Sequence, residues 1–350
     1  MQYTLQYALE APRQIGIRVT LGQPLIDLDE TDLARIKSLL ALHGAICLEN
    51  QPLEPTELHD FVEKWGEVIK LTGGLTNKNQ EPGLPSITRV GNIRTDGSII
   101  PGVNFSEYWH HDGDFWAPGE NFIINFLNSV VVPPVGGRTG FIDTLRAYEL
   151  LTDLQKSELE GAWICVRGSE ISDFKNAAVH ELPADAEHPL LFPHPQTGKI
   201  VLYVPDSSTG IQSADGQLIS TSQSLIDSLI LQAGIYEHEW QQGDLVITDN
   251  LQAMHRSMGG YGDNPRLLYR CQARIPMNTP CLLVRIPFAP LTFRTCRMNT
   301  EHFNEMDLAI SLARDAMAEG NGPSGCVIVG ADGRVLSKGH NQVHITGDLT

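Results

Sequence analysis

Hydrophobic and polar residues near the N-terminus follow the period of a helix, then of a strand, then of a helix again. In residues 30–43 the apolar side chains recur every three or four positions, which predicts an amphipathic helix capped by Thr31 or Asp32. The apolar run 44–50 predicts a short strand, and the periodicity of residues 55–68 predicts a second helix that begins with proline. We therefore expect two helices packed against the edge of a sheet.

From about residue 85 the pattern changes to short apolar runs separated by Gly, Pro and Asn. These runs are residues 86–93, 121–132, 137–143, 162–168, 200–204, 244–250 and 267–275. Short strands at close spacing are typical of sandwiches and barrels, whose edges accept inserted helices. Residues 144–161 and 220–235 predict two such helices. The predicted fold class is α+β, with a double-stranded β-helix (jelly roll) as its core and helices flanking it.

The C-terminal part of the chain predicts a separate unit. Residues 286–303 contain two prolines and show no clear period, so we predict a linker there, between a main domain of residues 1–285 and a segment of residues 304–350. In that segment an amphipathic helix is followed by two apolar runs joined by Asp332 and Gly333, which is a strong hairpin signal.

Composition and charge narrow the class of partner. The formal net charge is −17 without a basic cluster, which argues against binding to nucleic acid or an anionic membrane surface. The N-terminus has no signal-peptide pattern, no window of about 18 residues is apolar, and the six cysteines form no Cys-x-x-Cys pair. We expect a cytoplasmic protein with reduced, buried cysteines and a small-molecule partner. A homo-oligomer is compatible with the sequence, which does not specify one.

The segment 107–115 carries the most informative chemistry. On a strand, His110 and Asp112 would point to the same side, and an imidazole beside a carboxylate can occupy two neighbouring positions on an octahedral metal. His111 is expected on the opposite side, in packing or behind the site. Asp114 shares the parity of Asp112, so periodicity leaves both carboxylates open.

A third ligand has to come from a distant part of the chain. His255 lies just past the end of the predicted core strand 244–250, unlike the histidines that sit in polar surroundings. Arg266 and Arg270, four residues apart, would share one side of the next strand. Burying both is costly without anions, which a dianionic co-substrate and an acidic substrate would supply through guanidinium–carboxylate pairing. A salt bridge to an Asp or Glu of the chain is the alternative.

Taken together, these pieces resemble the TauD/TfdA-like family, the taurine/2-oxoglutarate dioxygenases. The likeness covers about residues 15–275. It rests on several motifs in the family's order, namely WHHD (109–112), GGRTGF (136–141), HPQTGK (194–199), GDLVITDNLQAMHR (243–256) and RLLYR (266–270). Each motif alone is modest, and their order makes the resemblance specific.

The resemblance implies a role for each matching position. His110, Asp112 and His255 would bind Fe(II). Thr139 and Arg266 would hold the distal carboxylate of 2-oxoglutarate. Arg270 matches a position that meets either the co-substrate or the anionic group of the substrate, depending on the branch of the family.

The reaction that the resemblance implies uses Fe(II), 2-oxoglutarate and O2, and releases succinate and CO2. Hydroxylation is the expected outcome, with desaturation, C–N cleavage and isonitrile formation as alternatives. The histidine with which relatives bind a sulfonate is not evident, so we expect an amino-acid-like or other small carboxylate substrate, with Tyr108, Trp116 and Thr72 as candidate contacts. The competing classes are a catalytically silent binding protein on the same scaffold and a zinc hydrolase. Neither needs this combination of metal ligands and arginines.

Residues 304–350 resemble the start of a cytidine/guanine-deaminase-like domain. The sequence stops at Thr350, before the zinc-binding His, the catalytic Glu and the Pro-Cys-x-x-Cys motif of that family. We therefore expect no zinc site and no deaminase activity in this segment.

Overall fold

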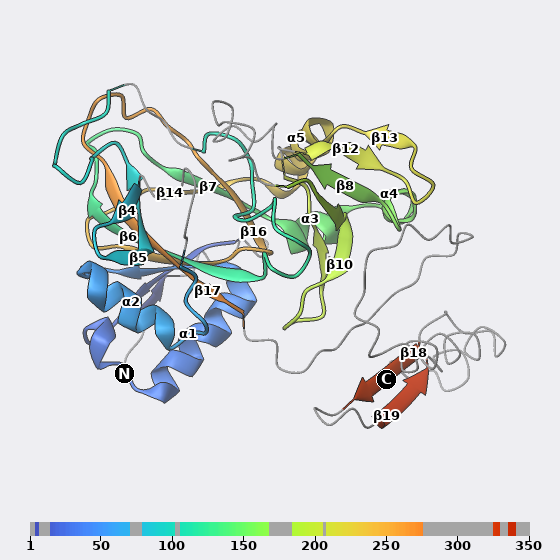
Figure 1. The fold of residues 1–350 in the computed structure, drawn as a ribbon, viewed down its shortest axis with the longest axis horizontal. Coiled ribbons are helices and arrows are strands. Elements are labelled where there is room, and N and C mark those ends of the chain that lie inside the picture. The colour runs from blue at the N-terminus through green and yellow to red at the C-terminus, as the bar shows by residue number, and fades with distance from the viewer. Residues whose placement is uncertain are drawn as a thin grey trace. The chain divides into compact units, whose positions relative to one another are not determined.

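The computed structural model describes residues 4–6, 15–70, 79–101, 106–167, 184–205, 208–275, 325–329 and 335–340. The chain divides into two compact units, Met1–Pro276 and Met277–Thr350 (Figure 1). The predicted domain end at residue 285 and the predicted linker 286–303 lie outside the described residues. The first unit contains the predicted site residues that the structure describes.

An eight-stranded sheet forms the centre of the first unit. Its order is β1 (Thr4–Gln6), β2 (Ile17–Thr20), β3 (Ala45–Glu49), β15 (Leu245–Asp249), β6 (Ile123–Val131), β17 (Leu267–Arg274), β5 (Leu84–Gly91) and β4 (Gln80–Glu81). Within this sheet β2 and β3 pair in parallel, and the other neighbours pair antiparallel. The strands predicted from the apolar runs at β3, β5, β6, β15 and β17 are confirmed.

A three-stranded sheet of β14 (Tyr236–His238), β7 (Thr139–Asp143) and β16 (Ala253–Ser257) packs over one face of the large sheet. Alternate residues of β15 show how the layers separate. Val246 joins the apolar cluster that includes Phe141 of β7, whereas Leu245 and Ile247 join a cluster on the opposite face. The fold is mixed α+β and mostly sheet, and the two facing sheets are compatible with the predicted jelly roll.

Helices α1 (Glu30–His43) and α2 (Pro55–Glu63) cover the other face of the large sheet, whereas the sequence predicted that they pack against its edge (Figure 1). Ile36 of α1 and Phe61 of α2 are fully or almost fully buried in the same cluster as Phe126 of β6. The rings of Phe61 and Phe126 meet edge to face, with centroids 6.1 Å apart. The short 3-10 helix η1 (Leu25–Asp27) leads into α1.

The cap of α1 is Asp29, so the predicted caps Thr31 and Asp32 were wrong. The Asp29 backbone is extended, and its side chain accepts a hydrogen bond from the Asp32 N–H at 2.8 Å. Thr31 and Asp32 already lie in the first turn, where their backbone is helical and cannot supply a cap. The error is one of boundary, since the helix covers the predicted residues.

A third group of elements packs around its own apolar cluster beside the two sheets. It consists of β8 (Trp163–Val166), β9 (Ala186–Pro189), β12 (Ser208–Gln212), β13 (Leu218–Ser220), the pair β10 (Leu191–Pro193) and β11 (Ile200–Leu202), and helices α3 (Thr144–Leu150), α4 (Asp153–Leu159) and α5 (Ser222–Ala233). Helix α5 confirms the prediction for residues 220–235.

The single helix predicted over residues 144–161 is two helices, α3 and α4. Leu151 and Thr152 are extended, and Thr152 begins α4 with a capping box, in which its hydroxyl accepts from Gln155 N and Gln155 Oε1 accepts from Thr152 N. A Thr-x-x-Gln sequence in the middle of a periodic stretch therefore signals a new helix start, which periodicity alone does not reveal.

In the second unit the structure describes β18 (Gly325–Val329) and β19 (Val335–His340), which pair antiparallel. This confirms the predicted hairpin, while the preceding predicted helix lies outside the described residues. Across the part of the chain that is described, no helix has the length and apolar character needed to cross a bilayer.

Candidate metal centre and anion-binding residues

A two-way backbone bridge joins the two histidines of the predicted site. His110 N donates to His255 O, and His255 N donates to His110 O, each at 3.0 Å. The sequence placed His255 beyond β15, and the structure adds that it lies inside another strand, β16, opposite Phe141 of β7. The two imidazole rings are centred 4.4 Å apart.

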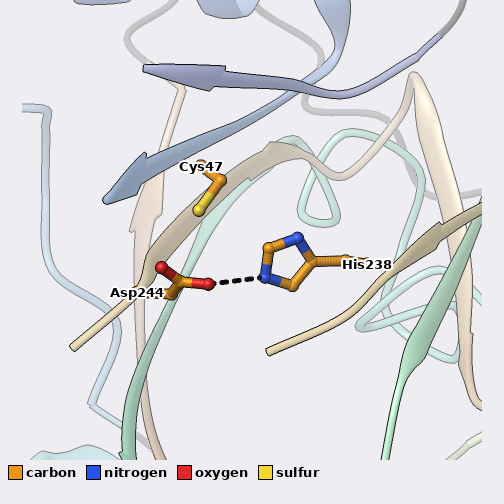
Figure 2. A group of neighbouring side chains, drawn as sticks. All are labelled: Cys47, His238 and Asp244. Atoms are coloured by element: carbon orange, nitrogen blue, oxygen red, sulfur yellow. Dashed lines mark ion pairs between the residues drawn. The ribbon is translucent and has the colours of Figure 1, made fainter. Parts of the chain in front are cut away.

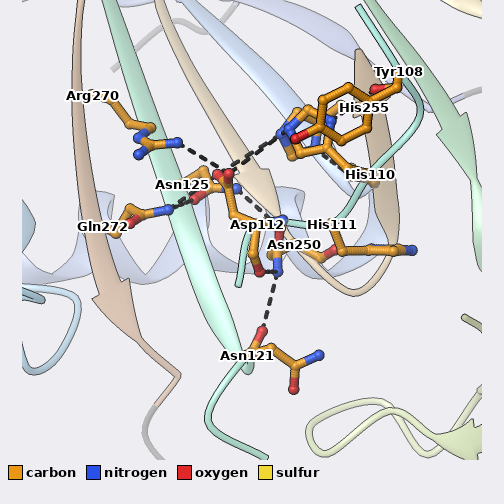
Figure 3. A network of polar contacts seen from close by, with 11 residues as sticks. Tyr108, His110, His111, Asp112, Asn121, Asn125, Asn250, His255, Arg270 and Gln272 are labelled. Atoms are coloured by element: carbon orange, nitrogen blue, oxygen red, sulfur yellow. Dashed lines mark hydrogen bonds and ion pairs between the residues drawn. The ribbon is translucent and has the colours of Figure 1, made fainter. Parts of the chain in front are cut away.

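Asp112 reaches these histidines from a turn. Residues 107–115 do not form the strand that the parity argument assumed: His110 forms the bridge, and the chain then turns through Gly113, whose φ is +68°. A side chain at Gly113 would overlap the Trp116 ring, 2.3 Å from an added Cβ, so this turn requires glycine. Asp112 Oδ1 lies 3.9 Å from His110 Nε2, and Oδ2 lies 3.8 Å from His255 Nε2 (Figure 3).

Carbonyl oxygens set the proton positions on both rings. Nδ1 of His110 lies 2.9 Å from Tyr108 O, and Nδ1 of His255 lies 3.1 Å from Ala253 O. Because a carbonyl oxygen only accepts, each Nδ1 donates, so the nitrogen of each ring that can coordinate a metal is Nε2. Burial, followed by the nearby His110, lowers the pKa of His255 to about 4, so this ring is neutral at pH 7.

The carboxylate of Asp112 is held in its charged form. Burial would raise its pKa, but Arg270 and the two histidines outweigh burial and hold the pKa below the usual value. Its two oxygens and the two Nε2 atoms face one another, with the three ligand atoms within 4.8 Å of each other. Two imidazole nitrogens and one carboxylate form a donor set that fits Fe(II).

Three amide side chains around Asp112 were not predicted as part of the site. Gln272 donates to Asp112 Oδ2 at 3.0 Å and to Asn125 Oδ1 at 2.7 Å. Asn250 accepts from Asp112 N at 2.8 Å and donates to Asp112 O at 2.9 Å (Figure 3). Strand parity could have identified Gln272, because it lies two residues from Arg270 on β17.

The two competing residues of the segment point elsewhere. As predicted, His111 lies behind the site: its buried ring stacks on Tyr203 with centroids 4.3 Å apart, and its Nδ1 lies 2.6 Å from Asn250 O. Asp114 is also buried, and its backbone oxygen accepts from His188 Nε2 at 2.7 Å. Asp114 does not belong to the group of converging ligand atoms, so the geometry favours Asp112.

Arg266 is a buried cation without an acidic partner among the described residues. Its exposure is 4%, its Nε donates to Gly137 O at 3.3 Å, and its guanidinium lies 5.6 Å from the centre of the Tyr261 ring. Burial lowers its pKa. The salt bridge to an Asp or Glu that the sequence left as an alternative is therefore not what holds Arg266.

Thr139 lies at the start of β7, where it pairs with Ser257, two residues beyond His255. Its hydroxyl accepts a hydrogen bond from Trp240 Nε1 at 3.0 Å. Because alternate residues of a strand share one side, Thr139 lies on the same side of β7 as Phe141, which belongs to the cluster between the sheets. Because the hydroxyl oxygen accepts from Trp240, the hydroxyl hydrogen can be donated to a further acceptor.

Arg270 does form a salt bridge, with Asp112 itself. Its Nη1 donates to Asp112 Oδ1 at 3.0 Å, and its buried Nε has no hydrogen-bond partner among the described residues. Tyr108 lies beside the histidines, with its ring 5.0 Å from that of His110, whereas Trp116 packs edge to face on Phe115. Thr72, the remaining predicted contact, lies outside the described residues.

A second group that could hold a metal consists of Cys47, His238 and Asp244 (Figure 2). Arg18 already supplies the positive charge there, because its Nη2 lies 3.2 Å from both oxygens of Asp244. Burial raises the pKa of the Cys47 thiol well above its usual value, so the sulfur stays protonated and is a poor ligand. We interpret this group as a buried ion-pair network.

Known proteins are similar to this chain in sequence and in fold. The family described as "Taurine catabolism dioxygenase TauD, TfdA family" matches residues 7–272. The α-ketoglutarate-dependent 2,4-dichlorophenoxyacetate dioxygenase of Cupriavidus pinatubonensis is 27% identical over 261 residues, 69% of this chain and 86% of that protein. Pentalenolactone F synthase of Streptomyces arenae is 29% identical over 254 residues, 65% of this chain and 82% of that protein.

A solved structure shares the fold. The crystal structure of AAD-2 in complex with Mn(II) and N-oxalylglycine has a TM-score of 0.63 and 21% sequence identity, and covers 78% of this chain and 97% of that chain. The family match ends before the second unit begins.

Proposed function

Because the chain belongs to the TauD/TfdA family and is thus an Fe(II)- and 2-oxoglutarate-dependent dioxygenase, we propose that it hydroxylates a small carboxylate beside an iron held by His110, Asp112 and His255. When bound, iron and 2-oxoglutarate would react with O2 to supply the oxidant, and 2-oxoglutarate would leave as succinate and CO2. The protein's own part is to hold the iron with three side chains and to orient both acids beside it.

Arg266 is the observation that carries the proposal. A guanidinium that is 4% exposed and lacks an acidic partner in the described residues is strongly unfavourable unless a ligand supplies the opposite charge. Arg266 can present two parallel N–H donors to a carboxylate. We assign it the distal carboxylate of 2-oxoglutarate, with the Thr139 hydroxyl as a second donor.

Arg270 supports the proposed class of substrate. One of its donors meets Asp112, and its buried Nε has no partner within the described part of the chain, so it retains capacity for a second anion. Two relatives are named for aromatic acids, a 2,4-dichlorophenoxyacetate dioxygenase and an (S)-phenoxypropionate dioxygenase. A carboxylate substrate beside Arg270, with Tyr108, Trp116 and Thr72 as further contacts, is consistent with both observations.

Metal and co-substrate binding test this proposal directly. Anaerobic addition of Fe(II) and 2-oxoglutarate should produce a weak visible charge-transfer band, and His255→Ala should abolish both the band and succinate release. The loss should exceed the roughly 10–100-fold effect of changing a residue outside the ligand set. His43→Ala, on α1 and outside the groups of possible metal ligands, is the matched control.

Two outcomes would contradict the proposal. If folded, unaltered protein shows no charge-transfer band, the assignment of the iron site is contradicted. Undiminished succinate release by His255→Ala would show that the third ligand is a different residue. Succinate release measured across small carboxylates and amino acids then separates the proposed substrate class from other acids.

Two further proposals concern the wider molecule. We propose that the two facing sheets form the double-stranded β-helix of the family, with the iron ligands on its inner side. For residues 304–350, the deaminase-like resemblance stays a proposal that rests on sequence motifs and the β18–β19 hairpin.

A further inference from the structure

We propose that Gln272 is a positioning residue, which fixes the direction of the Asp112 carboxylate toward the metal. This inference rests on the proposed function, because Asp112 needs a fixed direction only if it is a ligand. Gln272 is 4% exposed on β17, two residues along the strand from Arg270. Its side chain reaches Asp112 from the large sheet, whereas Asp112 lies in the turn after the histidine bridge.

Both hydrogens of the Gln272 amide have partners. Nε2 donates to Asp112 Oδ2 at 3.0 Å and to Asn125 Oδ1 at 2.7 Å. Asn125 is the residue directly opposite Gln272 in the pairing of β17 with β6. The register of two central strands therefore fixes this amide, so it can hold a carboxylate in one orientation.

The contacts continue into a closed circuit that returns to Asp112. Asn125 Nδ2 donates to Asn250 Oδ1 at 3.2 Å, and Asp112 N donates to the same oxygen at 2.8 Å. Asn250 Nδ2 donates to Asp112 O at 2.9 Å (Figure 3). The side chain and the backbone of Asp112 are thus tied to one chain of amides, whose members are at most 4% exposed.

The two donors to Asp112 differ in charge and in freedom. Arg270 binds Oδ1 as a cation, which would repel a metal ion nearby, and its buried Nε meets no acceptor among the residues that the structure describes. Gln272 binds Oδ2 as a neutral amide with both hydrogens engaged. Of the two, Gln272 is therefore suited to orienting the carboxylate without opposing the metal.

The test compares two buried glutamines. Gln272→Met keeps the length of the side chain and removes its amide. Gln51→Met makes the same change at a buried glutamine whose amide contacts Leu25 N and Glu49 O, outside the circuit.

Co(II), an air-stable substitute for Fe(II), is titrated into each protein and followed by its visible absorption. We expect Gln272→Met to bind Co(II) about 10–100-fold more weakly and to shift the saturated spectrum. Gln51→Met should match the unaltered protein in both, while thermal unfolding reports any loss of stability in each.

The outcomes separate this inference from the proposed function. If Co(II) binds the unaltered protein and Gln272→Met equally tightly with the same spectrum, the positioning role is overturned and the proposed iron site stands. The proposed function falls, and this inference with it, if the unaltered protein does not bind Co(II). The same follows if Asp112→Ala binds Co(II) as tightly as the unaltered protein. If Gln272→Met does not fold, Gln272→Asn replaces it in the test. Its side chain is one methylene too short to reach both partners, so we expect the same loss of Co(II) affinity. Full Co(II) affinity in Gln272→Asn would overturn the positioning role.

Discussion

At the scale of single residues, burial decides the charge of several histidines. His188 is 2% exposed, and its Nε2 donates to Asp114 O at 2.7 Å. Burial lowers its pKa below the ordinary value, which is about 6.5 in an unfolded chain. The ring is thus neutral in the fold at pH values where the unfolded chain has already taken up a proton.

This difference makes stability depend on pH. A depressed histidine pKa leaves stability fully present above about pH 6.5, and stability falls as the pH drops from there toward the folded-state pKa. His188→Gln keeps a donor for Asp114 O and removes the titration. We expect its unfolding free energy, from urea titrations between pH 7 and 5, to fall less steeply, by up to about 1.4 kcal/mol per pH unit. Parallel slopes in the two proteins would contradict this assignment.

At the scale of elements, the turn between β6 and β7 supports Arg266, the residue to which we assign the distal carboxylate of 2-oxoglutarate. Gly136 and Gly137 have φ values of +73° and +72°, a backbone conformation that favours glycine. An added Cβ at Gly137 would lie 3.2 Å from Arg266 Nε, and Gly137 O accepts from that same Nε. The turn therefore sets where the guanidinium lies.

A pair of glycine variants separates this contact from backbone strain. Gly137→Ala and Gly262→Ala both place alanine at positive φ, which costs about 1–2 kcal/mol, but the added Cβ at Gly262 meets no atom within 4 Å. We expect both variants to unfold at lower temperature. The Kd of 2-oxoglutarate should rise several-fold in Gly137→Ala only. Equal co-substrate affinity in both variants would show that Arg266 is not the anion site or does not depend on the turn.

At the scale of the whole molecule, the compact unit Met1–Pro276 holds the site residues that the structure describes, and the family match ends at residue 272. Ile275 is still part of this unit, because it is buried and its N–H donates to Phe122 O. The unit therefore includes the complete strand β17 and its last packing contact.

This division predicts that residues 1–276 suffice for binding. A chain ending at Pro276 should bind Co(II) and 2-oxoglutarate with the affinities of the whole protein and should unfold cooperatively within a few degrees of it. Calorimetry and metal titration of the two proteins measure this. A shortened chain that aggregates or loses co-substrate affinity would show that the second unit contributes to the site.

The sequence by itself determined most of the elements and the kind of chemistry. Period-2 and helical patterns depend on local geometry, so β15, β17, α1 and α5 are visible in the printed residues. The proteins compared here support the predicted enzyme class, which rested on ordered motifs. Local signals also misled where a short capping motif or a glycine turn interrupts a pattern, as at Thr152 and Gly113.

Only the tertiary structure decided which side chains meet. The contacts of Asp112 with His255, Arg270 and Gln272 join residues far apart in the sequence, and they depend on strand register and on a turn. A shift of one residue would turn Gln272 away from Asn125, since alternate residues face opposite sides of a sheet. Residue types thus predict a metal site and an anion site, whereas the orientation of the Asp112 carboxylate is a property of the folded sheets.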